Sequence, residues 1–227
     1  MLHLNILFLI LLFIQINQSI SNIIITANTT DNLSSNFGYF CINKIYTINS
    51  SNLIIKVNNK VVKYYIYDSP SRTYKYEIKN PGKIEINFKF DIKDIADLIN
   101  GHNYNLKSIK IVSSNTRVTN MTNTFTFCDN LTSVDLSDFD ISSVTSFRWT
   151  FAGLKNLRSV KFGNFTTNSW CDMSHMFESC YNLEYLDLSG FGSSNTAIAG
   201  TMFKMFYNCI SLVSVILIIL IFLMLPK

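Results

Sequence analysis

The sequence predicts an α/β solenoid of about four short units, preceded by a small β-hairpin-rich module. Three observations predict it: an apolar pattern that recurs every 26 residues in the second half of the chain, a strict polar–apolar alternation in the first half, and an apolar composition. Of the 227 residues, 48% are hydrophobic and only 15% are charged. Such a chain has enough apolar surface to bury a core and is not expected to be disordered.

The N-terminal residues are typical of an export signal. Residues 4–14 are apolar apart from Asn5, and Ser19-Ile20-Ser21 offers small residues two apart, which suits cleavage after Ser21. We therefore expect residues 1–21 to be a signal peptide. An uncleaved anchor is the alternative, because Met1-Leu2-His3 lacks Lys and Arg.

Residues 22–90 are expected to form a β-rich N-terminal module. The stretch from Lys83 to Phe90 alternates polar and apolar residues throughout, which predicts a strand with one buried face. Turn residues at 58–60 and 80–82 separate further strand-like segments, so two successive hairpins are predicted. Their strands are expected at 53–57, 61–67, 73–78 and 83–90, with Ile84, Ile86, Phe88 and Phe90 on the buried face.

Residues 91–117 are expected to join the module to the repeats. Between Asp91 and Asn100 the apolar residues fall three or four apart, which predicts a short helix that caps the open end of the solenoid. A degenerate first repeat follows, carried by Leu106, Ile109 and Ile111.

Residues 118–217 hold the repeats, three full units and a fourth that is delayed by three residues. The four- and three-residue steps at the start of each unit predict a short helix, and the two-residue step near its end predicts a short strand. Because one helix and one strand cannot bury their own apolar sides, the units are expected to stack. The matched positions are Met121, Phe125, Cys128, Leu131, Val134, Leu136, Phe139; Phe147, Phe151, Leu154, Leu157, Val160, Phe162, Phe165; Met173, Phe177, Cys180, Leu183, Leu186, Leu188, Phe191; and Met202, Phe206, Cys209, Leu212, Val215, Leu217.

The stretches MTNTFTFCDNLTSVDLSDFD (residues 121–140) and MSHMFESCYNLEYLDLSGF (residues 173–191) resemble the surface-protein repeat of the BspA-like leucine-rich-repeat family. The resemblance covers about Leu106 to Leu217 and implies a leucine-rich-repeat solenoid. Members of that family are cell-surface or secreted proteins of bacteria and of some parasitic protists, and they are associated with adhesion to host proteins and cells. The family carries no catalytic residues, so the resemblance implies a binding protein and not an enzyme.

No residue pattern indicates catalysis, a cofactor or a metal. Cys171 and His175 stand four apart, but a nucleophile pair needs an orienting group and a metal site needs further ligands. His175 is therefore interpreted as an exposed surface residue. The net charge is +4, yet Lys and Arg form no cluster, which argues against nucleic-acid binding.

The five cysteines do not read as a disulfide framework. Cys128, Cys180 and Cys209 occupy one repeat position, where a small buried apolar residue fits. Buried free thiols are expected there, and a bridge between Cys180 and Cys209 in neighbouring units is the alternative.

One outward face of the predicted strands is the candidate binding surface. Positions 135, 161 and 187 share a register between apolar positions, so their side chains are expected to point away from the core. Such a face suits recognition of an extracellular protein or glycan, on a host or a neighbouring cell; a structural surface-coat protein without a specific ligand is the alternative. The candidate ligand-facing residues are Ser133, Asp135, Ser137, Ser159, Lys161, Tyr185, Asp187 and Ser189.

The C-terminal tail, residues 210–225, is apolar apart from Ser211 and Ser214. A membrane-spanning anchor, a lipid-anchor signal and a last rung of the solenoid are three interpretations of this tail. With the export signal, it predicts a protein at the cell surface or in the extracellular space. In a eukaryotic source, N-glycosylation is expected at the sequons that begin with Asn28, Asn32, Asn49, Asn120 and Asn164.

Overall fold

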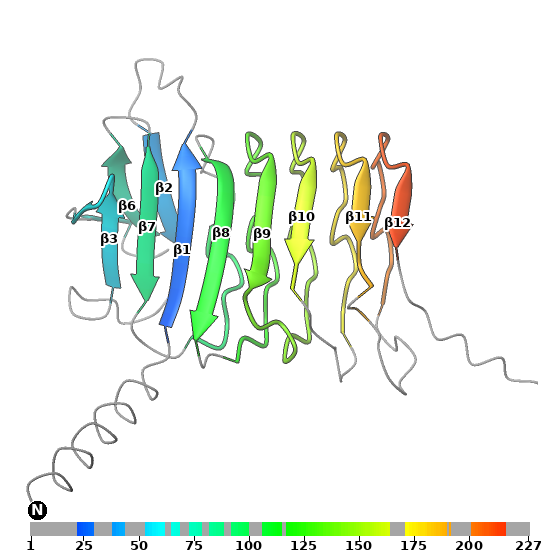
Figure 1. The fold of residues 1–227 in the computed structure, drawn as a ribbon, viewed down its shortest axis with the longest axis horizontal. Coiled ribbons are helices and arrows are strands. Elements are labelled where there is room, and N and C mark those ends of the chain that lie inside the picture. Colours follow the sequence, from blue (N-terminus) through cyan, green and yellow to red (C-terminus); the bar gives the residue numbers. More distant parts are fainter. Residues whose placement is uncertain are drawn as a thin grey trace, which may run out of the picture.

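The computed structural model describes residues 22–29, 38–43, 53–61, 65–68, 73–78, 82–88, 92–99, 106–114, 117–163, 171–189, 191 and 201–216. The regular structure of these residues consists of β-strands, most of them side by side in one long row (Figure 1). The strands are β1 (Asn22–Thr29), β2 (Gly38–Asn43), β3 (Leu53–Val57), β4 (Lys60–Val61), β5 (Tyr65–Asp68), β6 (Thr73–Ile78), β7 (Lys83–Phe88), β8 (Leu106–Ser114), β9 (Ser133–Asp138), β10 (Ser159–Phe162), β11 (Tyr185–Asp187) and β12 (Ser214–Ile216).

Seven strands form one sheet in the order β10-β9-β8-β1-β7-β3-β4, and its two halves meet at β8. That strand pairs antiparallel with β1 on one side and parallel with β9 on the other. The parallel pair β11-β12 forms a second sheet, which continues the row beyond β10 (Figure 1). The third sheet, β2-β6-β5, lies at the N-terminal end of the row. The repeats are therefore joined to the N-terminal module by continuous backbone hydrogen bonding.

The pairing predicted within the N-terminal module is only partly found. The tip of the first hairpin is present, because β3 pairs with β4 around Asn58 and Asn59, both at positive φ. The second hairpin is wrong: β6 pairs with β2 and β5, whereas β7 lies between β1 and β3. Ile84 and Ile86 are fully buried as predicted, while Phe90 and the side chain of Phe88 lie outside the described residues.

Each repeat contributes one rung to a stack. Ser133 pairs with Ser159 in the parallel ladder of β9 and β10, so residues 26 positions apart lie side by side. Equivalent buried side chains therefore form columns along the stack. The aromatic column shows this best, with ring centroids 5.6, 5.1 and 5.9 Å apart and interplanar angles of 17°, 9° and 9° along Phe125, Phe151, Phe177 and Phe206.

The predicted α/β leucine-rich-repeat solenoid is wrong, because the described residues contain no helix. The segment expected to be helical in each unit is a run of tight turns. The Thr124 N–H donates to the Met121 carbonyl within its own unit, whereas the neighbouring Asn123 N–H donates to the Arg148 carbonyl of the next unit. This alternation continues along the segment and recurs in the following units. A helix would keep these donors within one segment, but here half of them join adjacent units.

Left-handed backbone conformations explain why the apolar spacing imitates a helix. Asn123 and Phe127 have φ of 56° and 61°, and the pattern recurs at Trp149 and Gly153. In this run of turns Met121 and Phe125, four positions apart, are both buried, as they would be on one face of an α-helix. Local periodicity cannot distinguish the two, and hydrogen bonding to the neighbouring unit decides.

Residues 92–99 form the first layer of this turn ladder, and the short capping helix predicted there is also wrong. The N–H groups of Ile95 and Ile99 donate to the carbonyls of Asn120 and Thr124 at 2.9 and 3.0 Å. Ile92, Ile95 and Ile99 are fully buried. The layer belongs to one hydrophobic core, which runs from the N-terminal module into the last repeat.

Candidate binding surface

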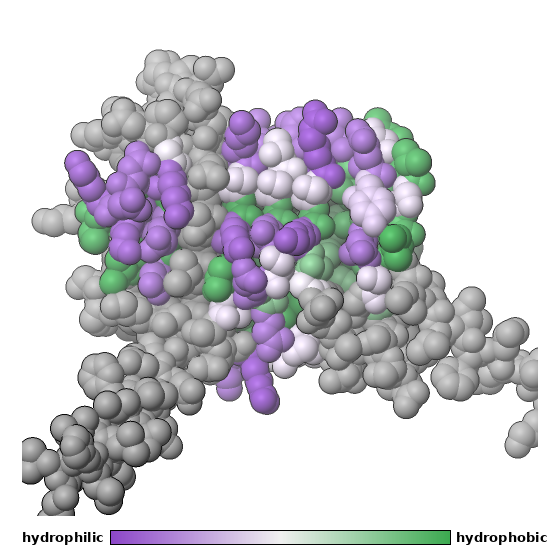
Figure 2. Space-filling model, viewed as in Figure 1, coloured by the Kyte–Doolittle hydropathy of each residue, from purple (hydrophilic) through white to green (hydrophobic). Residues whose placement is uncertain are grey.

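The outward side chains of β9, β10 and β11 and of the residues that follow them form a continuous face, called here the strand face. Along β9 the side chains of Val134 and Leu136 are buried, whereas those of Ser133, Asp135 and Ser137 point outward. Figure 2 shows hydrophilic residues spread over this part of the row.

The structure brings together most of the predicted ligand-facing residues. The register places Ser133 beside Ser159 and Asp135 beside Lys161. Ser137 follows Asp135 on β9, and the last three, Tyr185, Asp187 and Ser189, lie in and after β11, which is next to β10 but belongs to the second sheet.

Lys110 on β8 also belongs to the strand face, and the sequence analysis missed it. Its Nζ lies 2.6 Å from Asp138 Oδ2 and 3.8 Å from Asp135 Oδ2. The hydrogen bond to Asp138 raises the pKa of Lys110. Burial raises the pKa of the Asp135 carboxyl, but hydrogen bonds from Ser137 and the nearby lysines outweigh it and hold that pKa below its usual value. The signal was present in the sequence, since Lys110 stands 25 residues before Asp135 in the degenerate repeat.

At the C-terminal part of the strand face, the charged side chains form fewer ion pairs. Lys161 is exposed and forms no direct ion pair within the part of the chain that the structure describes, although its charge helps to lower the pKa of Asp135 beside it. Asp187 is exposed, and hydrogen bonds from the side chain and from the N–H of Ser189, the latter at 2.8 Å, lower its pKa. Tyr185, two residues earlier on β11, leaves 50% of its surface exposed. A cation, an anion and a phenol are therefore presented on adjacent rungs.

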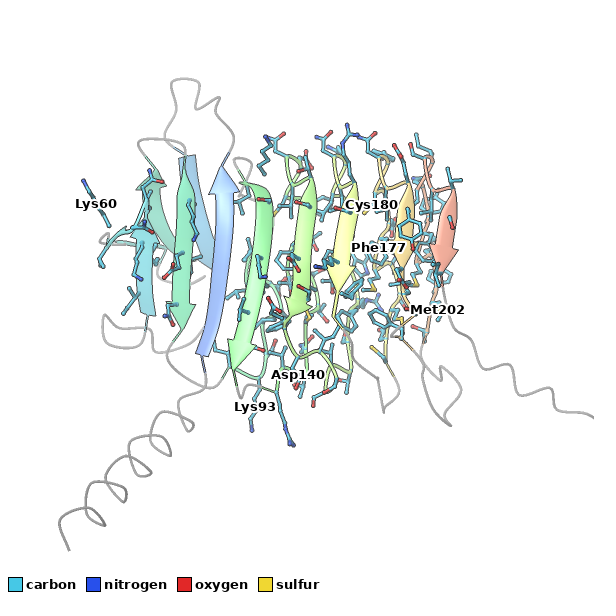
Figure 3. The ribbon with its side chains drawn as sticks, viewed as in Figure 1. Lys60, Lys93, Asp140, Phe177, Cys180 and Met202 are labelled. Atoms are coloured by element: carbon cyan, nitrogen blue, oxygen red, sulfur yellow. The ribbon has the colours of Figure 1, made fainter. Side chains whose placement is uncertain are left out.

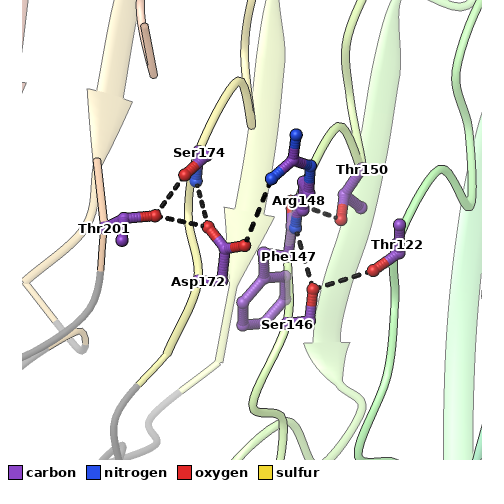
Figure 4. Close-up of polar contacts among 8 residues, drawn as sticks. All are labelled: Thr122, Ser146, Phe147, Arg148, Thr150, Asp172, Ser174 and Thr201. Atoms are coloured by element: carbon purple, nitrogen blue, oxygen red, sulfur yellow. Dashed lines mark hydrogen bonds and ion pairs between the residues drawn. The ribbon is translucent and has the colours of Figure 1, made fainter. Parts of the chain in front are cut away.

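A second polar group lies where each unit enters its turns. Backbone bridges join Asn120 to Ser146 and Ser146 to Asp172. Asp172 Oδ1 accepts the Ser174 N–H at 2.9 Å and the Thr201 hydroxyl at 2.7 Å, and Ser174 and Thr201 also share a hydroxyl contact (Figure 4).

The neighbouring unit supplies a cation to the same group. Arg148 Nη1 lies 3.8 Å from Asp172 Oδ2. Burial raises the pKa of Asp172, but the hydrogen bonds from Ser174 and Thr201 and the charge of Arg148 outweigh it and leave the pKa lowered. These contacts tie adjacent units together, so this polar group acts as a structural cap. A recurring Asn, Ser, Asp or Thr directly before each unit was the sequence signal for it.

His175 is buried, which corrects its interpretation as an exposed surface residue. Its ring packs between Trp149 and Phe203 at centroid distances of 4.8 and 5.3 Å, and its Nδ1 contacts the Glu178 carboxylate. Cys171 is also buried, and burial raises the pKa of its thiol to about 12. The geometry therefore offers no thiolate beside this imidazole.

Cys128, Cys171, Cys180 and Cys209 are free thiols, of which the first three are buried in the stack. Cys128 donates to the Ile99 carbonyl at 3.0 Å, and Cys180 to the Phe151 carbonyl at 3.1 Å, each in the preceding layer. Burial raises the pKa of Cys180 and of Cys209, the latter to about 11. Figure 3 shows Cys180 and Phe177 within the rungs, and Lys60 and Lys93 projecting from the surface. Among the described residues, no three His, Cys, Asp or Glu side chains gather as a metal site would require.

Several expectations concern residues beyond these. The signal peptide, Asn32, Asn49, Asn164 and residues 217–225 of the tail lie outside the described residues. Asn120 is described, and its Oδ1 accepts the Thr122 N–H at 3.0 Å. Where the chain is described, it contains no helix with the length and apolar character needed to cross a bilayer.

Together, these features define a class of protein: a stack of turn-and-strand repeats that presents a polar face and is joined to an N-terminal β module. Residues 93–216, more than half of the chain, match the family described as "Mycoplasma protein of unknown function, DUF285". The chain belongs to this family. The BspA-like leucine-rich-repeat family is not matched, so that resemblance is corrected. No curated protein and no solved structure matches the chain.

Proposed function

We propose that the protein is a surface-displayed or secreted binding protein that recognises an extracellular protein or glycan through its strand face. The observation that carries the proposal is the exposed group Lys161, Tyr185 and Asp187, held on adjacent rungs of a rigid stack. A cation, an anion and an aromatic ring offer hydrogen bonding and stacking to a polar partner. The proposal involves binding alone, without catalysis, a cofactor or a metal.

Rigidity supports this assignment. The side chains that alternate with the exposed group, such as Val160 and Leu186, are buried in the core. A face fixed in this way loses little conformational entropy on binding. Rungs about 4.8 Å apart give only a narrow surface, so we expect weak binding by single molecules and strong binding by many displayed together.

The test uses the full chain displayed at high density on cells or beads and measures binding to host cells and to matrix proteins and glycans. Saturable binding is expected, with a roughly tenfold or greater loss on combining Lys161→Ala, Tyr185→Ala and Asp187→Ala. The matched control combines Lys60→Ala and Lys93→Ala, which remove exposed cations outside the strand face.

Equal loss in the control would show nonspecific attraction by positive charge and contradict the proposal. Absence of saturable binding at high display density would instead favour a structural surface-coat protein without a specific ligand.

Localisation is tested separately. We propose that the protein is exported and held at the cell surface or released, with the apolar tail as a membrane attachment. Protease added to intact cells should then digest the protein, and alkaline carbonate should leave a membrane-attached form in the pellet. Protection of the protein in intact cells would contradict this part of the proposal.

A further inference from the structure

The last repeat unit, residues 201–216, is apolar where the earlier units are polar. Its exposed side chains include Val213, Ile210 and Phe203, with 87%, 79% and 64% of their surfaces accessible. Figure 2 shows hydrophobic residues gathered at this end of the row. Ile210, Val213 and Ile216 occupy register positions that are exposed or half-buried in the earlier units: Ile210 follows Asp129, Lys155 and Tyr181, Val213 follows Arg158 and Glu184, and Ile216 follows Lys161 and Asp187. Phe203 follows the exposed Arg148 and the buried Ser174.

Stacking alone does not account for this change. A further unit would cover the open end of the core columns and the position of Phe203, since the equivalent Ser174 is buried, but it would leave Ile210, Val213 and Ile216 accessible to water, as the equivalent positions are in the earlier units. The apolar positions come from the turns, from the loop before the strand and from β12 itself. They therefore surround the last unit, whereas a single protein partner would cover one side of it.

At the end of the stack formed by the last unit, backbone N–H groups are available as hydrogen-bond donors. In the earlier units, alternate N–H groups of the turns donate to the next unit, as His175 and Phe177 do to the carbonyls of Phe203 and Met205. The equivalent N–H groups of Lys204 and Phe206 meet no carbonyl among the described residues. If the last units of two copies met, N–H donors would face N–H donors. The last unit also cannot pair with the opposite end of another copy's turn ladder, because residues 92–99 at that end are largely buried.

The charged residues of this region are all positive. No Asp or Glu follows Asp187, whereas Lys204 and Lys227 supply positive charge. Lys204 Nζ lies 5.4 and 5.1 Å from the ring centroids of Phe203 and Tyr207, so its charge sits beside exposed aromatic rings. Aromatic rings, aliphatic side chains and a lysine are the residues that enter the boundary between lipid headgroups and acyl chains.

We infer that the last unit docks into the surface of an anionic lipid bilayer, so that the stack stands end-on. Phosphate and ester oxygens of the headgroups accept the N–H groups that end the turn ladder, and the apolar collar enters the acyl boundary. One rung is about 4.8 Å thick, which fits an interfacial insertion of about 5–10 Å. Residues 217–225, all apolar, continue from the same unit. The inference is independent of the ligand proposed for the strand face.

The test places a reporter tryptophan at Phe203 in the full chain, after Trp149 and Trp170 are replaced by Phe. Vesicles of phosphatidylcholine and phosphatidylglycerol carry bromine on the acyl chains near the headgroup. Strong quenching of Phe203→Trp is expected, and none of the matched control Val61→Trp, which is also exposed (71%) but lies at the other end of the molecule. Since the reporter reads its own position, attachment of the chain by other apolar segments does not imitate the result.

A second measurement needs no substitution. Hydrogen exchange of the unaltered chain, read on peptides, should slow in 201–209 when vesicles are added and stay unchanged in 53–61. Quenching that is absent at position 203, or equal at both positions, would overturn the inference. So would a dimer in vesicle-free solution that Phe203→Ser dissociates, because the end would then bind a second copy.

Discussion

The phenyl rings of Phe151 and Phe177 lie parallel, with an interplanar angle of 9° and a centroid distance of 5.1 Å, although 26 residues separate them. Each ring belongs to a different unit, so their contact exists only in the stack. The same ladder places the Phe151 N–H 2.9 Å from the Met176 carbonyl. Phe151 therefore contributes both ring stacking and a backbone hydrogen bond to the neighbouring unit.

Phe151→Ala should lower the free energy of unfolding by about 3–5 kcal/mol, because it leaves a cavity between two stacked rings. The matched control is Phe127→Ala, since that ring is more than half exposed, and its expected cost is below about 1 kcal/mol. Urea denaturation followed by circular dichroism measures both. Similar costs at the two positions would show that the aromatic column does not hold the stack.

Gly163→Ala should destabilise the protein by about 1–3 kcal/mol, because an added Cβ would lie 2.4 Å from the Ser137 carbonyl oxygen of the adjacent rung. The control is Gly82→Ala, where the three atoms nearest the added Cβ belong to the end of the Asn58 side chain, which can move away. Thermal unfolding of both variants gives the comparison. A neutral Gly163→Ala would mean that the rungs can separate locally without cost.

Acid should destabilise the protein partly through Asp172. Its pKa is lowered in the folded state, so its contribution is complete above the unfolded value of 3.8 and is lost as pH falls through the lower folded pKa. Asp172→Asn keeps an acceptor for Ser174 but removes the charge, so its stability should depend less on pH in this range. Urea midpoints at pH 6 and pH 3 measure the difference. An unchanged pH dependence would exclude the carboxylate as the source.

Alkali should destabilise the protein through Cys171. Its folded pKa is raised from 9.0 to about 12, so its contribution is complete below pH 9 and is lost as pH rises toward the folded value. Above pH 9, Cys171 should contribute a slope of about 1.4 kcal/mol per pH unit, and Cys171→Ala should remove that share while the shares of Cys180 and Cys209, whose pKa values burial also raises, remain. Urea midpoints between pH 9 and pH 11 compare the slopes of the two proteins.

Iodoacetamide offers an independent check on the same thiols. Cys209, whose pKa is raised only to about 11, should be alkylated before Cys171 in the folded protein. Peptide mass spectrometry reads the order. Rapid alkylation of Cys171 at pH 8 would contradict its burial.

The spacing of apolar and charged residues in the sequence was enough to predict which side chains are buried and which point outward in the repeats. The seven-position repeat identified the buried column of Phe125, Phe151 and Phe177, because equivalent positions of stacked units share the same environment. It also identified the outward positions of Asp135, Lys161 and Asp187, because burial alternates along a strand whatever its partners are. The eight predicted ligand-facing residues follow from the same register. Lys110 was missed because the first repeat is degenerate.

Tertiary structure alone decided the conformation of the turns and the partners of the N-terminal strands. A residue four positions from its neighbour reaches the core from a helix or from a coil of turns, and only hydrogen bonding between units separates the two, as at Asn123 and Arg148. Likewise, alternation shows that β6 and β7 are strands but not that β2 and β1 are their neighbours. A sequence encodes which side of a segment is apolar, whereas pairing depends on residues that are distant along the chain and become adjacent only on folding.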